Sequence, residues 1–136
     1  MGLFSKKLNY PELDSGNPAA ELVQEVEKPL KELMGQVPDQ IEVVPSADCT
    51  YVFIGKPPKK FGVAKIEEGK VQSFVAVAKE KGLDPVKMQK INEKFRDAYT
   101  HNMDAPRYKT NVAGKEVVVT PCAPLVQEVS QIMNSI

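Results

Sequence analysis

The sequence predicts a single α+β domain in which an antiparallel sheet of about five strands carries helices packed mainly on one face. Two pairs of β-branched and aromatic runs flank short loops, over residues 50–66 and 107–120, and runs of this kind pair as hairpins. Strands joined by hairpins are antiparallel. Four other segments place apolar residues at helical spacing, so each buries one stripe against the sheet.

The first sixteen residues show no periodicity. We expect a loosely ordered N-terminal arm over residues 1–16, followed by a single domain over residues 17–136. Asn17 followed by Pro18 is a typical helix start, because the first side chain caps the free donors and the proline fits the first turn. Pro29 removes one backbone donor within this helix, but the apolar stripe keeps its phase, so we predict one kinked helix.

Strands follow the first helix. The first predicted strand covers Gln40–Val44, and the hairpin at 50–66 comes next with a loop over 55–60. Two prolines in that loop keep it out of the sheet. Residues 71–78 are apolar at positions i, i+3, i+4 and i+7, so we predict a helix there. A strand is the alternative, since both alternating faces of this segment are apolar.

The clearest helix boundary signals lie at residues 82–85. Gly82 suits the left-handed residue that follows a helix, Asp84 suits an N-cap, and Pro85 suits the first helical position. The helix that begins here carries its apolar stripe to residue 102.

A second hairpin over 107–120 leads into a last helix that begins at Ala123 and Pro124. The predicted order is therefore helix, three strands, two helices, two strands and helix. A hairpin, a helical insertion and a second hairpin give an element order similar to that of PAS-like and profilin-like sheets. This resemblance of order implies a small-ligand sensor domain.

The composition is that of a soluble globular protein. The chain has 136 residues, of which 42% are hydrophobic and 26% charged. The longest apolar run, residues 74–78, is far shorter than the roughly 20 residues that span a bilayer. The N-terminus lacks the apolar core of a signal peptide. We therefore expect a cytoplasmic protein that does not associate with membranes.

Several catalytic signatures are absent from the sequence. It contains no glycine-rich phosphate-binding motif, no serine nucleophile elbow and no Cys-x-x-Cys pair. His101 is the only histidine, which excludes metal sites built from several histidines. We expect no cofactor, no metal and no catalytic site, with an enzyme that uses Cys122 or His101 as an alternative.

A basic loop and a basic helix face are the candidate binding features. The net charge is zero, but residues 51–115 carry fourteen basic and seven acidic side chains. The loop at 55–60 and the helix that begins at Asp84 contribute the candidate residues Lys56, Lys59, Lys60, Lys87 and Lys90. Clustered lysines attract anions, whereas a solvated face is the ordinary role of such residues.

Cys122 and His101 are the two side chains with chemical reactivity to consider. Cys122 precedes the last helix, where the free backbone donors favour a reactive or regulatory thiol. The alternative is a small apolar residue packed under the helix start. His101 lies at the C-terminal end of its helix, where the helix dipole and Asp97, one turn back, stabilise a protonated imidazole.

The leading functional hypothesis is a small non-enzymatic module that binds a protein partner or a small anionic ligand. The first alternative is a small-ligand sensor with a closed pocket lined by Phe53, Phe74 and Phe95. The second is phosphate or nucleic-acid binding through the basic residues, with Phe61 and Tyr108 as candidates for base stacking. The neutral total charge disfavours nucleic acid.

Overall fold

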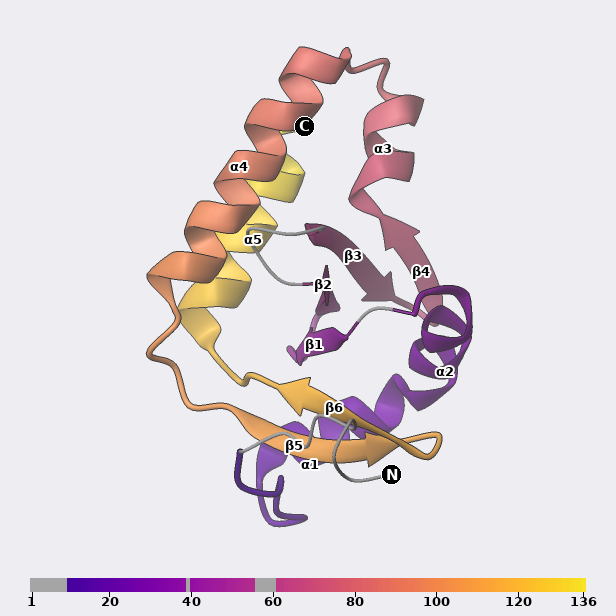
Figure 1. The fold of residues 1–136 in the computed structure, drawn as a ribbon, viewed down its shortest axis with the longest axis vertical. Coiled ribbons are helices and arrows are strands. Elements are labelled where there is room, and N and C mark those ends of the chain that lie inside the picture. The colour runs from indigo at the N-terminus through magenta and orange to yellow at the C-terminus, as the bar shows by residue number, and fades with distance from the viewer. Residues whose placement is uncertain (1–9, 39, 56–60) are drawn as a thin grey trace.

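A six-stranded sheet crosses the middle of the molecule, with helices on either side of it in Figure 1. The structure, a computed structural model, describes residues 10–38, 40–55 and 61–136; residues 1–9, 39 and 56–60 lie outside the description. In chain order the elements are α1 (Pro18–Glu25), α2 (Glu27–Gln36), β1 (Ile41–Val44), β2 (Thr50–Gly55), β3 (Phe61–Glu67), β4 (Lys70–Ser73), α3 (Phe74–Glu80), α4 (Pro85–His101), β5 (Tyr108–Val112), β6 (Lys115–Val119) and α5 (Ala123–Asn134).

The sheet is mixed. Its strand order is β4-β3-β2-β1-β6-β5, and neighbouring strands are antiparallel except for β1 and β6, in which Val43 pairs with Val119 in parallel. The predicted antiparallel sheet of about five strands is therefore only roughly right, since the described residues form six strands. The chain crosses over through α3 and α4 before β6 returns beside β1, and parallel strands need a crossover of this kind.

Helices cover both faces of the sheet. Val43 and Val52 pack with the apolar residues of α1 and α2, whereas Val44 and Phe53 pack with those of α3, α4 and α5. The prediction that helices pack mainly on one face is therefore wrong. The adjacent residues Val43 and Val44 of β1, and Val52 and Phe53 of β2, are apolar and buried, so each of the two faces requires its own cover.

The first predicted helix is two helices. Asn17 caps α1 by accepting a hydrogen bond from the Ala19 N–H at 2.9 Å, as predicted. Val26 then leaves helical geometry, and α2 begins at the next residue. Pro29 falls in the first turn of α2, where a missing N–H is tolerated, so the chain breaks ahead of the proline instead of bending at it.

Residues 11–13 lie along the outer strand β5. The Leu13 N–H donates to the Lys109 carbonyl at 2.8 Å, and the Lys109 N–H donates to the Pro11 carbonyl at 2.9 Å. Leu13 also packs against the core under α1 and α2. This edge of the sheet is thus partly covered by the chain itself.

The segment predicted as a helix from residue 71 divides into a strand and a helix. β4 ends at Ser73, whose Oγ accepts from the Ala76 N–H at 3.1 Å and so caps α3. The signals after α3 are confirmed: Gly82 has φ +69°, and Asp84 accepts from the Lys87 N–H at 2.8 Å. Residues 70–73 form a strand because they pair with β3, and the helix starts only after the capping serine.

The last helix begins as predicted, with Cys122 at the N-cap position of α5. α4 and α5 lie side by side over the sheet (Figure 1). Within the described ranges, no helix combines the length and the hydrophobicity that a membrane crossing requires.

Candidate functional site

An apolar groove of about 490 Å³ lies where one end of the sheet meets α3 and α4. The β2–β3 end of the sheet forms its floor, the start of α3 forms one wall, and the first turns of α4 form the other. Its described lining residues are Val37, Ile54, Phe61, Gly62, Val63, Ser73, Phe74, Val75, Met88, Gln89 and Asn92. None of these residues is charged, and the polar ones carry neutral hydroxyl or amide groups.

The walls of the groove are held in place by the core. The ring of Phe61 stacks on Phe53 with a centroid distance of 5.3 Å, and Phe74 meets Phe95 edge to face at 5.1 Å. Phe53 and Phe95 are fully buried. Of the three phenylalanines predicted to line a closed pocket, Phe74 alone lines the groove, whereas the other two belong to the core behind it.

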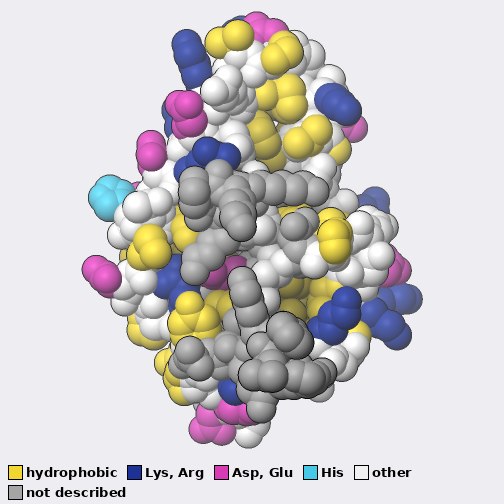
Figure 2. Space-filling model, in the orientation of Figure 1, with side chains coloured by type: hydrophobic (Ala, Val, Ile, Leu, Met, Phe, Trp, Pro, Cys, Tyr) yellow, Lys and Arg dark blue, Asp and Glu magenta, His cyan; other side chains and the backbone are white. Residues whose placement is uncertain are grey.

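One apolar side chain of the lining is exposed to solvent. Val75 is 46% exposed, whereas Val86 on α4, at 63% exposed, does not line the groove. Figure 2 shows hydrophobic side chains at the surface between α3 and α4. Exposed apolar patches bordered by polar residues are typical of interaction surfaces.

Of the predicted basic residues, those that the structure describes do not line this groove. Lys56, Lys59 and Lys60 lie outside the described residues. Lys87 and Lys90 are exposed on α4, and neither lines the groove. Of the two aromatic residues considered for base stacking, Phe61 is 6% exposed and belongs to the core, and Tyr108 is half-buried on β5.

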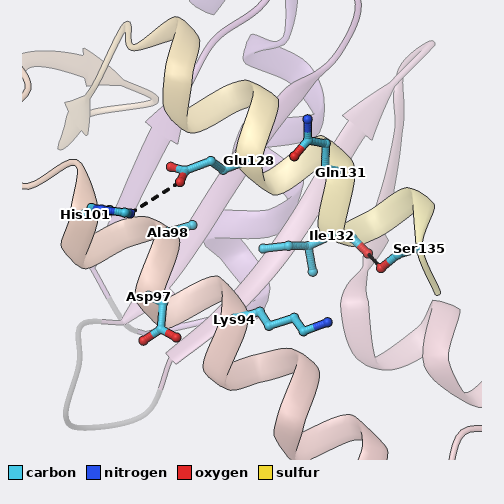
Figure 3. A pocket seen from close by; sticks show the side chains of 8 residues that line it. All are labelled: Lys94, Asp97, Ala98, His101, Glu128, Gln131, Ile132 and Ser135. Carbon is cyan, nitrogen blue, oxygen red and sulfur yellow. Dashed lines mark hydrogen bonds and ion pairs between the residues drawn. The ribbon is translucent and has the colours of Figure 1, made fainter.

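A second hollow lies between α4 and α5, and His101 is one of its lining residues. Figure 3 shows His101 and Glu128 pointing toward one another across it, with Nδ1 and Oε1 3.5 Å apart. The carboxylate that meets the imidazole thus comes from α5 and is not that of Asp97. Asn102 connects the same carboxylate to Cys122, since its Nδ2 donates to Glu128 at 2.5 Å and its Oδ1 accepts from the Cys122 Sγ at 3.6 Å. Cys122 and His101 are therefore linked through two other side chains and do not form a direct pair.

Cys122 is expected to react with iodoacetamide faster than Cys49. Both thiols are half-buried and pack against the core, but Cys122 also lines a surface hollow of about 460 Å³ at the start of α5, and Cys49 is not part of that lining. Free N–H groups at a helix start also stabilise an anionic sulfur. Timed labelling with mass spectrometry compares the two, with Cys122→Ser and Cys49→Ser as controls. Equal rates would show that Cys122 is only a packing residue.

A buried polar cluster, which the sequence analysis missed, joins β1 to α4, to the residue before β5 and to the residue after β6. Glu42 is 8% exposed. Its Oε1 accepts from the Tyr99 hydroxyl at 2.9 Å, and its Oε2 accepts from the Thr120 hydroxyl at 2.7 Å and from Arg107 Nε at 3.1 Å. The one available signal was a carboxylate within the apolar strand Ile41–Val44, because a charge in such a place needs partners.

Two buried tyrosines give the protein a pH-dependent stability in alkali. Burial raises the pKa of Tyr51 to about 12, and burial followed by the negative charge of Glu42 raises the pKa of Tyr99. Tyrosine side chains in the unfolded chain have a pKa of about 10. Above that pH the unfolded state binds fewer protons than the folded state, so stability falls as pH rises.

We therefore expect the free energy of unfolding in urea to lose part of its value between pH 10 and about 12, the window set by the raised pKa of Tyr51. Tyr51→Phe should reduce the dependence of the unfolding free energy on pH over this window. In the wild-type protein, absorbance at the phenolate band should show that Tyr51 ionises at a higher pH than a tyrosine in an unfolded chain. A slope that is unchanged in Tyr51→Phe would contradict the assignment.

Comparisons with protein families, curated proteins and solved structures found no match to this chain. Within residues 10–38, 40–55 and 61–136, no group of three or more histidine, cysteine, aspartate or glutamate side chains is placed to hold a metal ion. The apolar groove is the feature of the described structure with the clearest capacity to bind a ligand.

Proposed function

We propose that this protein is a non-enzymatic binding module that takes an apolar segment of a partner protein into the groove between β3, α3 and α4. The observation that carries the proposal is the groove itself, with rigid aromatic walls and an exposed valine at its rim. A wall that does not move on binding loses little conformational entropy, which favours affinity.

The chemistry of the lining selects the kind of partner. Because no described lining residue is charged, a charged segment would lose its hydration in the groove and gain no ion pair from these residues. Ser73, Gln89 and Asn92 offer neutral donors and acceptors along the rim, which suits the amide groups of a peptide backbone. An uncharged, apolar peptide segment fits this surface better than an anionic ligand does.

Val75→Asp is expected to weaken partner binding by about tenfold or more, because it places an unpaired carboxylate against the bound apolar segment. Val86→Asp is the matched control. Each valine is the second residue of its helix, where a carboxylate interacts favourably with the helix dipole, so both variants should remain folded. The probe is a phage-displayed library of linear decapeptides, with the dissociation constants of the selected peptides measured by fluorescence anisotropy.

The proposal requires peptides that bind the wild-type protein and Val86→Asp but bind Val75→Asp weakly. It is contradicted if the library yields no binder, or if the selected peptides bind both variants equally well. Circular dichroism of the two variants verifies that the comparison is between folded proteins.

A further inference from the structure

Met88 combines access to solvent with a place in the wall of the apolar groove. It lies in the first turns of α4, is half-buried, and packs against the core that α4 shares with the sheet. Of the other described methionines, Met34 and Met133 are each 9% exposed and Met103 is 51% exposed, and none of these three lines the groove. Met88 is therefore the described methionine that an oxidant in solution can reach and that a segment bound in the groove would also contact.

We propose that Met88 is a redox modification site, and that its oxidation by a peroxide releases the bound segment from the groove. This inference rests on the proposed function and adds regulation to it. The thioether sulfur attacks one oxygen of hydrogen peroxide, so that an S–O bond forms and the O–O bond breaks. The hydroxide that leaves takes the proton of the transferred oxygen and becomes water. The sulfur loses two electrons and the peroxide gains them, and the product is methionine sulfoxide.

A sulfoxide changes the chemistry of the groove wall. The flexible, apolar thioether becomes a polar group that is a strong hydrogen-bond acceptor. The described residues around it are apolar or carry neutral polar groups. An apolar segment bound against the new oxygen would remove it from water without supplying a donor, and an unpaired buried acceptor costs free energy.

Asn92 gives the oxidised side chain a second way to weaken binding. It also lines the groove, and it lies four residues after Met88 on α4, where side chains are neighbours on the helix surface. Its amide N–H groups can donate to the sulfoxide oxygen. A donor engaged in this way is no longer offered to the backbone of a bound peptide. Oxidation therefore acts against binding whether the new oxygen stays unpaired or takes the Asn92 amide.

The test compares peptide affinity before and after oxidation. A decapeptide that is selected on the wild-type protein, and that contains neither methionine nor cysteine, is titrated against protein treated with hydrogen peroxide. Mass spectrometry of tryptic fragments measures oxidation at each methionine. Dithiothreitol is then added, since it reverses disulfide and sulfenic oxidation of the cysteine thiols but leaves methionine sulfoxide in place. The dissociation constant should rise by about tenfold or more once Met88 is oxidised, and methionine sulfoxide reductases should restore it.

Three variants separate Met88 from the other oxidisable residues. Met103→Leu should lose affinity on oxidation as the wild-type protein does, because Met103 does not line the groove. Met88→Leu, whatever its starting affinity, should change by less than about twofold on oxidation, because it holds no thioether at this position. Met88→Gln should bind weakly without any oxidant, since its side chain places a polar amide in the same part of the wall.

Four results would overturn regulation at Met88. They are full affinity after Met88 is oxidised, oxidation of Met34 or Met133 ahead of Met88, a loss of affinity in oxidised Met88→Leu equal to that of the wild-type protein, and full binding by a folded Met88→Gln. Circular dichroism of the oxidised protein should match that of the reduced protein. If the oxidised protein were unfolded, the loss would be one of fold, and the proposal would again be wrong.

The proposed function fails in a different measurement. Peptides that bind the reduced protein independently of Val75 would overturn the proposed function and, with it, this inference. That result needs no oxidant, whereas every result against regulation at Met88 is obtained with peptides whose binding already depends on Val75. The two failures are therefore distinguishable.

Discussion

Replacing Arg107 with alanine is expected to destabilise the protein by about 3–5 kcal/mol, the range for breaking a buried ion pair by removing one partner. The side chains of Arg107 and Glu42 are 7% and 10% exposed, and their ion pair is 3.1 Å long. Arg107 Nη1 also donates to the Met103 carbonyl at 2.7 Å, and the guanidinium lies 5.5 Å from the centre of the Tyr99 ring. Its loss leaves the Glu42 carboxylate buried without its cation and releases the loop after α4.

Urea denaturation monitored by circular dichroism measures the effect. Glu67→Ala is the control, because the Lys65–Glu67 pair has a similar length of 3.4 Å but lies at the surface, with side chains 25% and 50% exposed, and surface pairs contribute about 0–1 kcal/mol. A double variant, Glu42→Leu with Arg107→Met, should recover much of the loss, since an apolar replacement of both partners removes the uncompensated charge. If Arg107→Ala cost no more than Glu67→Ala, the cluster would not be a stabilising part of the core.

Local signals predicted several of the helix ends. Asn17 and Asp84 cap their helices, Gly82 adopts the left-handed conformation, and Cys122 stands at the start of α5. These features depend on a few adjacent residues, whose conformational preferences act wherever the chain places them. Features that depend only on adjacent residues can therefore be predicted from the sequence.

Pairings over long distances could not be predicted in the same way. The parallel contact of β1 with β6 joins residues on either side of six intervening elements. Glu42 finds Tyr99 and Thr120 at separations of 57 and 78 residues. Nothing in a single sequence specifies such partners, although the burial of a carboxylate implies that partners exist. The continuous apolar run of β2 did indicate that helices cover both faces of the sheet, because a strand with one exposed face alternates apolar and polar residues.

The groove depends on one local boundary that the sequence analysis placed wrongly. Predicting a helix over residues 71–78 removes β4 and moves the start of α3, whose first residues line the groove. Phe74 lines the groove, but the sequence analysis placed Phe53 and Phe95 beside it in a closed pocket, and both of these rings belong to the core. Whether an apolar side chain faces a cavity or the core depends on the packing of neighbouring elements, which periodicity does not contain.

Phe95→Ala is expected to cost about 3–5 kcal/mol, the range for removing a buried phenylalanine ring from a core. Phe95 is 0% exposed, and it belongs to the core that the sheet shares with α3, α4 and α5. Its ring also supports Phe74, the groove wall, at 5.1 Å. Peptide binding should therefore weaken together with stability, whereas Val86→Ala, at an exposed site on the same helix, should change stability by less than about 0.5 kcal/mol.

Urea melts measure the free energy of unfolding, and Phe95→Leu distinguishes loss of volume from loss of the ring. Leucine fills most of the space, so its cost should be less than half that of alanine, because the residual cavity is smaller. If Phe95→Leu keeps stability but still weakens peptide binding, the aromatic contact with Phe74 is what holds the groove wall. A cost below about 1 kcal/mol for Phe95→Ala would instead place Phe95 outside the core. The Phe95 ring on α4 would then not be what holds the groove wall in place.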